Sequence, residues 1–315
     1  MKISFLLPFY VIVFDLYRSN DMLRLYKMRG DTMIKIGLTG WGDHPDLYTS
    51  SKKERLRDYS SHFPVVELDA SFYAIQPLKN ALKWLKETPD NFQFVVKAYQ
   101  EITGHLRGES PFNSPKEMFE IYRQSIIPFK EEGKLSMVLV QFPPWFQCEK
   151  ENVDYLLRVR EELRDFEVAI EFRHQSWYYP EVKTGTIDFL RSHSFHHTVC
   201  DEPQVGAGCV PLVPIATTDK VLVRLHGRNT YGWINPGNNE KWREVRYLYD
   251  YNKEELLAIQ KDCEQLEKQA REVVVLFNNN SGGHAAKNAK AFQQMLGIEY
   301  KGLSPKQLDL FEGGI

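Results

Sequence analysis

The sequence contains little cysteine and almost no net charge, and each shortage excludes a class of protein. Its 315 residues include four cysteines and no C-x-x-C pair; the four are Cys148, Cys200, Cys209 and Cys263. In a chain of this size they indicate reduced thiols, so we expect a cytoplasmic protein and exclude a disulfide-stapled scaffold. The net charge of −2 gives no overall attraction to nucleic acid or to an anionic membrane. Contact with a polyanion would therefore require a local patch of cations.

The chain also lacks a hydrophobic run long enough to cross a bilayer, so we expect no membrane partner. Residues 3–14, ISFLLPFYVIVF, form an apolar run of twelve, whereas a membrane helix needs about 20. The run has the length of a signal-peptide core, but no small-residue cleavage site follows it. Codons for Arg29-Gly30-Asp31 can spell a bacterial ribosome-binding site just before Met33. We therefore predict that the natural protein starts at Met33 and that residues 1–32 are a non-native or disordered extension.

From Met33 onward the chain alternates between short β-rich segments and longer amphipathic ones. The expected strands are 34–41, 65–73, 92–99, 135–142, 167–173, 196–201, 220–227 and 272–279. Helical periodicity marks 52–62, 78–87, 115–132, 149–164, 184–193, 253–271 and 284–296. Start signals precede two of these helices, Ser114-Pro115 and Asn252.

This alternation runs without a linker or an internal repeat, and it predicts the α/β class with a single (β/α)8 TIM-type barrel over residues 33–297. The Gly/Pro-rich stretch PQVGAGCVPLVPIATTD, residues 203–219, indicates that a loop replaces helix six. An open doubly wound sheet is the alternative. It is weaker because GLTGWGDHPD has no G-x-G-x-x-G leading into a helix.

Polar residues gather where the predicted strands end, and in a barrel these ends and the following loops form the site. The strand-end residues are Glu67, Asp69, Ser71, Lys97, Glu171, Arg173, Asp201, Arg224, His226, Arg228 and Asn278. Alternation along a strand places Glu171 with Arg173, and Arg224 with His226, on shared faces. Buried charges are costly unless paired, so we expect these side chains to meet at the barrel mouth. The competing interpretation is a salt-bridged polar layer that plugs the barrel without reacting.

These residue types predict anion recognition combined with acid–base chemistry. The predicted catalytic groups are Glu67, Glu171 and His226, and the predicted substrate- or anion-binding groups are Lys97, Arg173, Arg224, Arg228, Asn278, Trp177 and Tyr231. A Schiff base on Lys97 is disfavoured because an inward barrel lysine more often serves as an ion-pair partner.

A divalent metal is a further option, with the cofactor unknown. Its candidate ligands are Glu67, Glu171, Asp201, His226 and His105. The sequence has no H-x-H or H-E-x-x-H pattern, and Lys97, Arg173 and Arg224 would crowd a cation.

Several stretches, in order from Met33 to about residue 297, resemble one family. They are GLTGW, VELDASFY, VVKAYQEITGH, QFPPWF, EFRHQSW, VRLHGR and FNNNSGGHAAKNA. On these motifs the chain resembles the YecE-like family, domain of unknown function 72. The resemblance implies a TIM-type barrel and no established reaction, and the matching site positions are Glu67, Lys97, His105, Glu171, Arg173, Arg224, His226 and Asn278. Strand two reads ELDASFY where the family commonly has EINSTFY, so Asp69 departs from the pattern.

Residues 298–315 form a predicted C-terminal tail that contains the pentapeptide QLDLF. Its residues Gln307, Leu308, Leu310 and Phe311 match the peptide with which bacterial replication and repair proteins dock on the DNA sliding clamp. The alternative is a tail folded back onto the barrel through its apolar side chains.

Three functions remain open at this point. The first is a nucleic-acid-associated protein, such as a phosphodiester hydrolase recruited to DNA by the tail. The second is an enzyme acting on a phosphorylated or carboxylated sugar, and the third is a non-catalytic binding module. The modest net charge counts against duplex binding, and the tail favours the first function.

Overall fold

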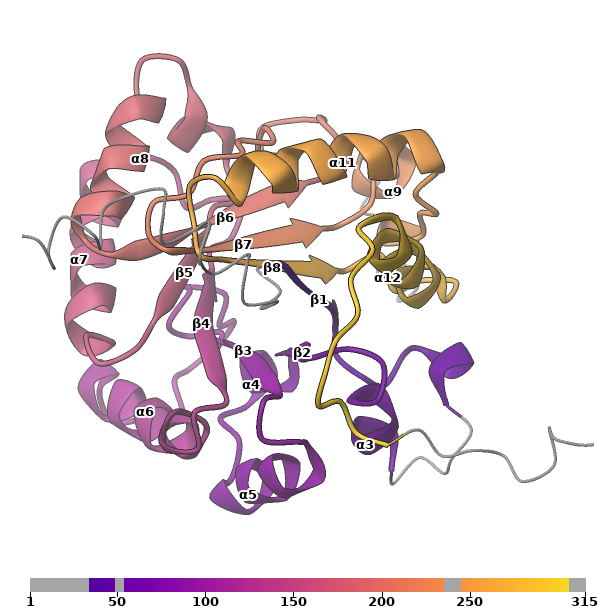
Figure 1. The fold of residues 1–315 in the computed structure, drawn as a ribbon. Helices are drawn as coiled ribbons and strands as arrows, with labels where there is room; N and C mark the ends of the chain where they lie inside the picture. Colours follow the sequence, from indigo (N-terminus) through magenta and orange to yellow (C-terminus); the bar gives the residue numbers. More distant parts are fainter. Residues whose placement is uncertain (1–33, 49–53, 235–244, 306–315) are drawn as a thin grey trace, which may run out of the picture.

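The structure is a computed structural model that describes residues 34–48, 54–234 and 245–305. Eight parallel strands close into one barrel in sequence order, with β1 hydrogen-bonded to β8 (Figure 1). They are β1 Ile34–Thr39, β2 Val65–Leu68, β3 Gln93–Lys97, β4 Leu135–Gln141, β5 Val168–Glu171, β6 Phe195–Asp201, β7 Lys220–Leu225 and β8 Glu272–Phe277. The prediction of an α/β TIM-type barrel is confirmed.

Helices surround the ring of strands and cover its outer side (Figure 1). The α-helices of the described residues are α3 Arg55–Tyr59, α4 Ala70–Tyr73, α5 Leu78–Glu87, α6 Pro115–Glu131, α7 Lys150–Glu162, α8 Lys183–Ser192, α9 Thr230–Ile234, α11 Lys253–Leu266 and α12 His284–Met295. Two 3-10 helices, η1 Pro45–Leu47 and η2 Gln175–Tyr178, lie in loops. The segment 202–219 joins β6 to β7 and contributes Val210, Val213 and Ala216 to the outer core.

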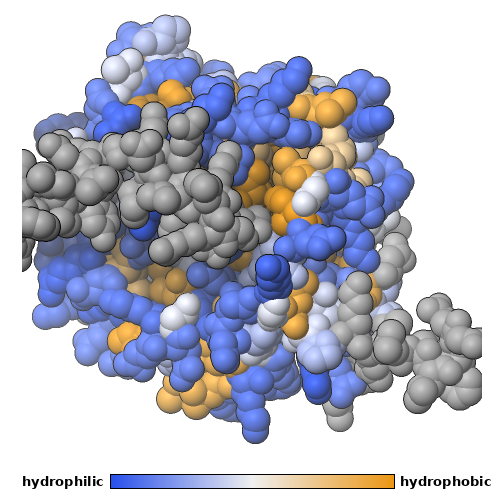
Figure 2. Space-filling view, in the orientation of Figure 1, coloured by the Kyte–Doolittle hydropathy of each residue, from blue (hydrophilic) through white to orange (hydrophobic). Residues whose placement is uncertain are grey.

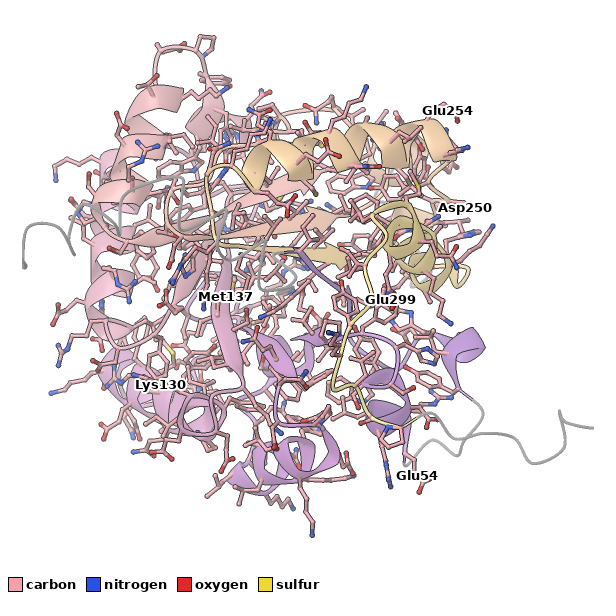
Figure 3. All side chains as sticks on the ribbon, viewed as in Figure 1. Glu54, Lys130, Met137, Asp250, Glu254 and Glu299 are labelled. Carbon is pink, nitrogen blue, oxygen red and sulfur yellow. The ribbon has the colours of Figure 1, made fainter. Side chains whose placement is uncertain are left out.

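The strands divide the core into an inner and an outer part because successive side chains point to opposite faces. The inner cluster fills the ring with Val65, Val95, Met137, Leu139, Ala169, Leu222, Val274 and Leu276. Met137 of β4, labelled in Figure 3, is fully buried in this cluster. The alternate residues of the strands pack outward against the helices. The barrel is therefore filled below its mouth and can hold a ligand only at an end.

Specific side chains set the helix ends. The Ser114 hydroxyl accepts from the Glu117 amide and Pro115 opens α6, while Asn252 and Glu255 form a capping box on α11. Both predicted start signals are confirmed. At the far end of α5 the buried Lys134 ammonium donates to the carbonyls of Leu85 and Thr88 at 2.8 Å each, which satisfies groups that a helix end leaves unpaired.

The second strand is shorter than its sequence pattern suggests. We expected a strand over 65–73, but β2 ends at Leu68 and Asp69 precedes the short helix α4. The Ser71 hydroxyl lies within hydrogen-bonding distance, 2.7 Å, of the carbonyls of both Leu68 and Lys97 and fixes the turn. The polar–apolar alternation of ELDASFY fits a strand, but these local bonds favour a helical turn. Asp69 is thereby placed at the mouth.

After α12 the chain returns across the barrel. The Tyr300 hydroxyl accepts from the amide of Ile36, and the amide of Ser304 donates to the carbonyl of Ser60. The first residues of the predicted tail thus pack against β1 and α3. The predicted extension 1–32 and the QLDLF pentapeptide lie outside the described residues.

Hydrophilic side chains, shown in blue, cover most of the face seen in Figure 2, and hydrophobic side chains gather in small patches. Within the described residues no helix combines the length and apolarity that a bilayer crossing requires.

Candidate functional site

Arg224 of β7 lies at the centre of a buried ion-pair layer at the carboxyl ends of the strands. Its Nε and Nη2 donate to the two oxygens of Glu67 at 2.9 and 2.7 Å, a bidentate fork. Its Nη1 donates to Glu171 at 2.7 Å and to Gln141 at 3.0 Å. The Thr39 hydroxyl adds a bond to Glu67 at 3.3 Å. One guanidinium therefore joins side chains from β2, β4 and β5 across the ring.

A second guanidinium, that of Arg173, extends the layer towards β6. Its Nη1 donates to Glu171 at 3.1 Å, and its Nη2 lies 3.0 Å from a carboxylate oxygen of Glu202. The His226 Nε2 lies 3.3 Å from Glu171 and 3.2 Å from Arg173. The indole of Trp233 covers Arg173 at 4.7 Å from the ring centroid. The predicted meeting of these charged residues is confirmed by their contacts.

Burial and neighbouring charges shift the pKa values of the carboxyl groups and the imidazole of the layer in different directions. Burial raises the pKa of Glu67. Burial alone would also raise the pKa of Glu171, but the charge of Arg224, with the hydrogen bond to His226 and the charge of Arg173, outweighs burial and holds that pKa well below its usual range. Burial lowers the pKa of His226 to about 3 and raises the pKa of Glu202 to about 7. At neutral pH Glu171 is a carboxylate and His226 is a neutral imidazole.

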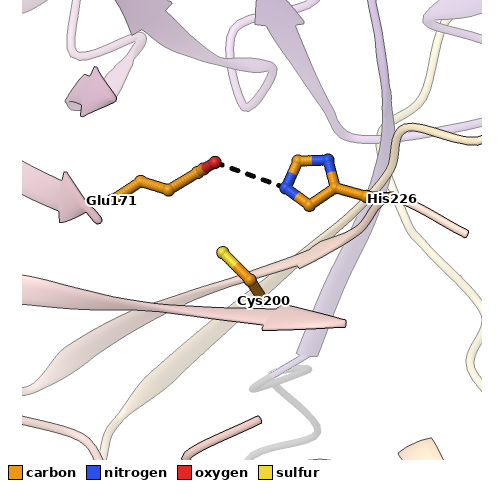
Figure 4. Close-up of side chains that lie close together, drawn as sticks. All are labelled: Glu171, Cys200 and His226. Carbon is orange, nitrogen blue, oxygen red and sulfur yellow. Dashed lines mark ion pairs between the residues drawn. The ribbon is translucent and has the colours of Figure 1, made fainter. Parts of the chain in front are cut away.

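Among the described residues, one group has the geometry of a metal-binding cluster, Glu171, Cys200 and His226 (Figure 4). One ligand atom from each residue lies within 4.8 Å of the others. Both oxygens of Glu171, however, already pair with the guanidinium groups of Arg224 and Arg173. Burial also raises the pKa of the Cys200 thiol well above its usual range. This donor set suits zinc by residue type, but the two adjacent cations make it a poor site for a metal.

The edge of the layer that faces solvent is built differently. Lys97 donates to Asp69 at 2.9 Å, and these side chains are 10% and 35% exposed. Asp69 and Glu67 raise the pKa of Lys97 despite its burial, so it is an ammonium. The ammonium lies 4.6 Å from the ring centroid of Phe72, which contacts the imidazole of His105. The next ring along this edge is Trp145, which is 57% exposed.

A family model described as "Protein of unknown function DUF72" matches residues 35–309. The chain belongs to this family. UPF0759 protein YunF of Bacillus subtilis (strain 168) is 56% identical over 283 residues, which cover 89% of this chain and 100% of that protein. The predicted family resemblance is confirmed.

Two solved DUF72 structures have the same fold as this chain. The crystal structure of a DUF72 protein from Enterococcus faecalis V583 is 40% identical, with a TM-score of 0.82, and the match covers 88% of this chain and 100% of that one. A DUF72 protein from Thermotoga maritima MSB8 is 33% identical with a TM-score of 0.72, covering 85% and 100%.

Two residues expected at the mouth of the DUF72 barrel lie elsewhere. Trp177 is 2% exposed and stacks on Phe172 in the outer core, so it does not face a ligand. Asp201 points away from the ring, where Arg228 donates to both of its oxygens and the Tyr251 hydroxyl donates at 2.6 Å. The five predicted metal candidates therefore do not converge, because Asp201 is on the outer face of β6.

The other predicted residues lie at the mouth or at its rim. Asn278, the residue after β8, lies 2.8 Å from His226 Nδ1 and holds that imidazole in place. Tyr231 of α9 is 70% exposed. Arg228 is bound by Asp201 and Glu255 and fixes the base of the loop after β7.

Cys200 of β6 and Glu202, the residue after β6, were not among the predicted site residues, although both point towards the ring. In the register of the barrel Cys200 pairs with Arg224, whose side chain is inward, so Cys200 and Glu202 share the inward parity. A period-two count would have found them if the inward parity of β6 had been known. All seven residues of β6 are buried, so no polar–apolar alternation identified that parity.

Proposed function

We propose that this DUF72 protein is an enzyme that acts on a small substrate carrying a phosphate or a carboxylate, bound at the carboxyl-end mouth of the barrel. One observation carries the proposal. Lys97 has three N–H groups, and among the described residues Asp69 is its one hydrogen-bond acceptor. Its remaining donors are available to an anion at an edge that is partly exposed.

The buried layer supports this edge. Glu67 and Glu171 are fully buried, and Arg224 and His226 are 1% exposed, so these groups hold one another and do not reach a ligand directly. Ionic networks of this kind are rigid because their charged groups are held by several partners at once. The layer positions Lys97 through the charge of Glu67 and closes the barrel beneath the substrate.

Asp69 is the group of this edge best suited to transfer a proton. It is the carboxylate nearest to Lys97, and at 35% side-chain exposure it can reach a bound molecule. A carboxylate beside an anchored anion can act as a general base or acid on an adjacent hydroxyl or C–H group. The predicted catalytic roles of Glu67, Glu171 and His226 then become supporting ones, through electrostatics and position.

The experiment measures thermal stabilisation by inorganic phosphate, citrate and a panel of sugar phosphates. A ligand that binds the folded state raises its free energy of unfolding by about 2.7 kcal/mol at a concentration of 100 Kd. We expect anions to stabilise the wild type and to have no effect on Lys97→Met. Lys79→Met, which changes an exposed lysine of α5, is the matched control. Equal stabilisation of the wild type and Lys97→Met would refute the proposal.

A nucleic-acid substrate is the second candidate. Trp145 and Tyr231 are 57% and 70% exposed, and exposed rings can stack on unpaired bases. A labelled single-stranded oligonucleotide tests it. Binding that weakens with salt and is lost in Trp145→Ala supports this function, and the absence of binding at low salt removes it.

Recruitment by a DNA sliding clamp is a separate proposal on the QLDLF pentapeptide. Its support is the sequence match alone, and it is tested by mixing purified clamp with this protein. Complex formation that is lost in the double variant Leu310→Ala/Phe311→Ala is the expected result. A complex unaffected by these substitutions, or no complex, ends the proposal.

A further inference from the structure

His105 lies beside the anion edge and contacts two aromatic rings. Its ring is 5.1 Å from that of Phe72 and 5.8 Å from that of Trp145, centroid to centroid. Phe72 also contacts the Lys97 ammonium, so the imidazole and the proposed anion anchor are neighbours of one ring. His105 and Lys97 therefore belong to the same mouth.

The turn that carries His105 fixes the position of its imidazole. The amide of His105 donates to the carbonyl of Gln100 at 2.8 Å, and Gly104 adopts a φ of 72° within the turn. The side chain of Thr103 is 1% exposed, and its hydroxyl lies 2.7 Å from Nδ1 of the imidazole. An imidazole held at its backbone and at one ring nitrogen is pre-organised for contact through the other nitrogen.

The orientation of the Thr103 hydroxyl is coupled to the tautomer of His105. That hydroxyl lies 3.1 Å from the carbonyl of Gln100 and 2.7 Å from Nδ1 of His105. When the hydroxyl proton is donated to Gln100, the Thr103 oxygen accepts from Nδ1–H of His105. In this tautomer the opposite nitrogen, Nε2, is a lone-pair acceptor, and it has no hydrogen-bond partner among the described residues.

The charges around His105 keep it in this neutral form. Burial, together with the charges of Lys97 and Arg173, lowers the pKa of His105 to about 4. A neutral acceptor nitrogen repels the ionised oxygens of a carboxylate or of a phosphate monoester. It attracts an O–H or N–H donor that sits next to the anionic group.

Trp145 offers a second contact for a ligand, beside the acceptor nitrogen of His105. More than half of its surface is exposed although its ring packs edge-on against His105. The negative face of an indole attracts the polarised C–H groups of a ring that lies flat upon it. A ligand that combines such a C–H face, hydroxyl donors and an anionic group is a sugar phosphate or a sugar acid.

We propose that His105 and Trp145 form a subsite for the hydroxylated ring of a sugar phosphate or sugar acid whose anionic group binds Lys97. The Nε2 of His105 accepts from a ring hydroxyl, and the indole stacks on the C–H face. This inference rests on the proposed function, which it deepens by naming the class of substrate.

Calorimetric titration of the full chain tests the subsite. The probes are inorganic phosphate, glucose 6-phosphate, ribose 5-phosphate, gluconate and adenosine monophosphate. We expect the wild type to bind at least one sugar ligand more tightly than inorganic phosphate. His105→Ala and Trp145→Ala should each weaken that sugar ligand by roughly two- to tenfold, the worth of one hydrogen bond or one ring contact. Binding of inorganic phosphate should change by less than about twofold in both variants.

Two further variants separate a lost contact from a damaged fold. His105→Gln offers an acceptor oxygen near the position of Nε2 and should recover part of the sugar affinity. Leu82→Ala removes an exposed apolar side chain from α5 and should leave all affinities unchanged.

The outcomes distinguish the two proposals. If no probe binds, or if Lys97→Met binds as the wild type does, the proposed function fails and the subsite fails with it. If inorganic phosphate binds but no sugar ligand binds more tightly, the subsite is wrong and the anion site stands. Tighter binding of adenosine monophosphate than of both sugar phosphates would assign the indole to a base and would also overturn the sugar assignment.

Discussion

Replacement of Arg224 by methionine removes the cation that joins the two halves of the buried layer. The side chains of Glu67 and Glu171 are 0% exposed and Arg224 is 1% exposed, so no water can take the place of the guanidinium. The variant leaves two buried carboxylates, with Arg173 as the remaining guanidinium near Glu171. Loss of one partner of a buried ion pair costs about 3–5 kcal/mol. That is a large fraction of the roughly 5–15 kcal/mol that stabilises a typical domain.

The loss must depend on pH, with a sign that follows from the two carboxyl groups. In the wild type the pKa of Glu171 lies below its unfolded value, so its stabilising contribution is present above that value and is lost at lower pH. Without Arg224 the pKa values of Glu67 and Glu171 both rise. The folded variant then binds protons that the unfolded chain does not, and it loses stability as pH increases. The difference in free energy of unfolding between wild type and variant therefore widens as pH rises above the unfolded-state pKa of the two carboxyl groups.

Urea unfolding at several pH values measures this difference. We expect Arg224→Met to lose about 3–5 kcal/mol near pH 8 and at least about 1 kcal/mol less near pH 5.5. Arg224→Lys keeps the charge without the fork and should lose less. Arg164→Met, in a pair whose side chains are 67% and 72% exposed, should change stability by about 0.5 kcal/mol or less. A loss below about 1 kcal/mol, or one independent of pH, would refute the reasoning.

Three further predictions concern single side chains, each measured by urea unfolding. The pKa of Glu202 is about 7 in the folded protein against an ordinary 4.5, so its stabilising contribution is present below about pH 4.5 and is lost as pH rises through about 7. Glu202→Gln should reduce this loss of stability with pH. An unchanged dependence of stability on pH would contradict the prediction. Lys134→Met removes the ammonium from two helix-end carbonyls and should cost about 1–3 kcal/mol, with faster amide exchange at the end of α5. Unchanged exchange there would show that the ammonium does not cap the helix. In Gly37→Ala the new Cβ would lie 2.1 Å from a carbonyl oxygen of β2, so this variant should destabilise the barrel. In Gly185→Ala, within α8, the new Cβ meets nothing within 4 Å, and the variant should stabilise the protein by about 0.5–1 kcal/mol. Equal effects of the two substitutions on stability would contradict this account.

Much of the barrel could be predicted because its strands and helices have sequence patterns that can be recognised within each segment alone. Strands read as short β-branched runs and helices as 3.6-residue patterns with capping residues such as Ser114 and Asn252. The error at 65–73 arose where a four-residue helix carries too few residues to show a period. The exposed fraction of an aromatic side chain could not be predicted from the neighbouring sequence either. Trp177 and Trp145 both follow strand ends, but Trp177 is buried and Trp145 is exposed.

The partners within the site depend on the register of strands far apart in the sequence. That charged residues would meet at the mouth follows from their position in the strands and from the cost of unpaired burial. That Arg224 would pair with Glu67, 157 residues away, depends on the closure of the ring. The inward parity of β6 depends on the same register, which is why Asp201 was assigned to the site in place of Glu202.

The pairing of Arg224 with Glu67 also has a consequence for how the barrel assembles. The two residues belong to β7 and β2, and β1 must meet β8 before the ring closes around them. In a half-formed barrel these charges would be in water, where their attraction is weak. The entropy of closing so long a loop must be lost before the buried ion pair can stabilise the chain. The ion pair therefore forms late on the folding path, and its loss should mainly accelerate unfolding rather than slow folding. We therefore expect the buried ion-pair layer beneath the mouth to slow the opening of the closed ring, and so to set the lifetime of the native state.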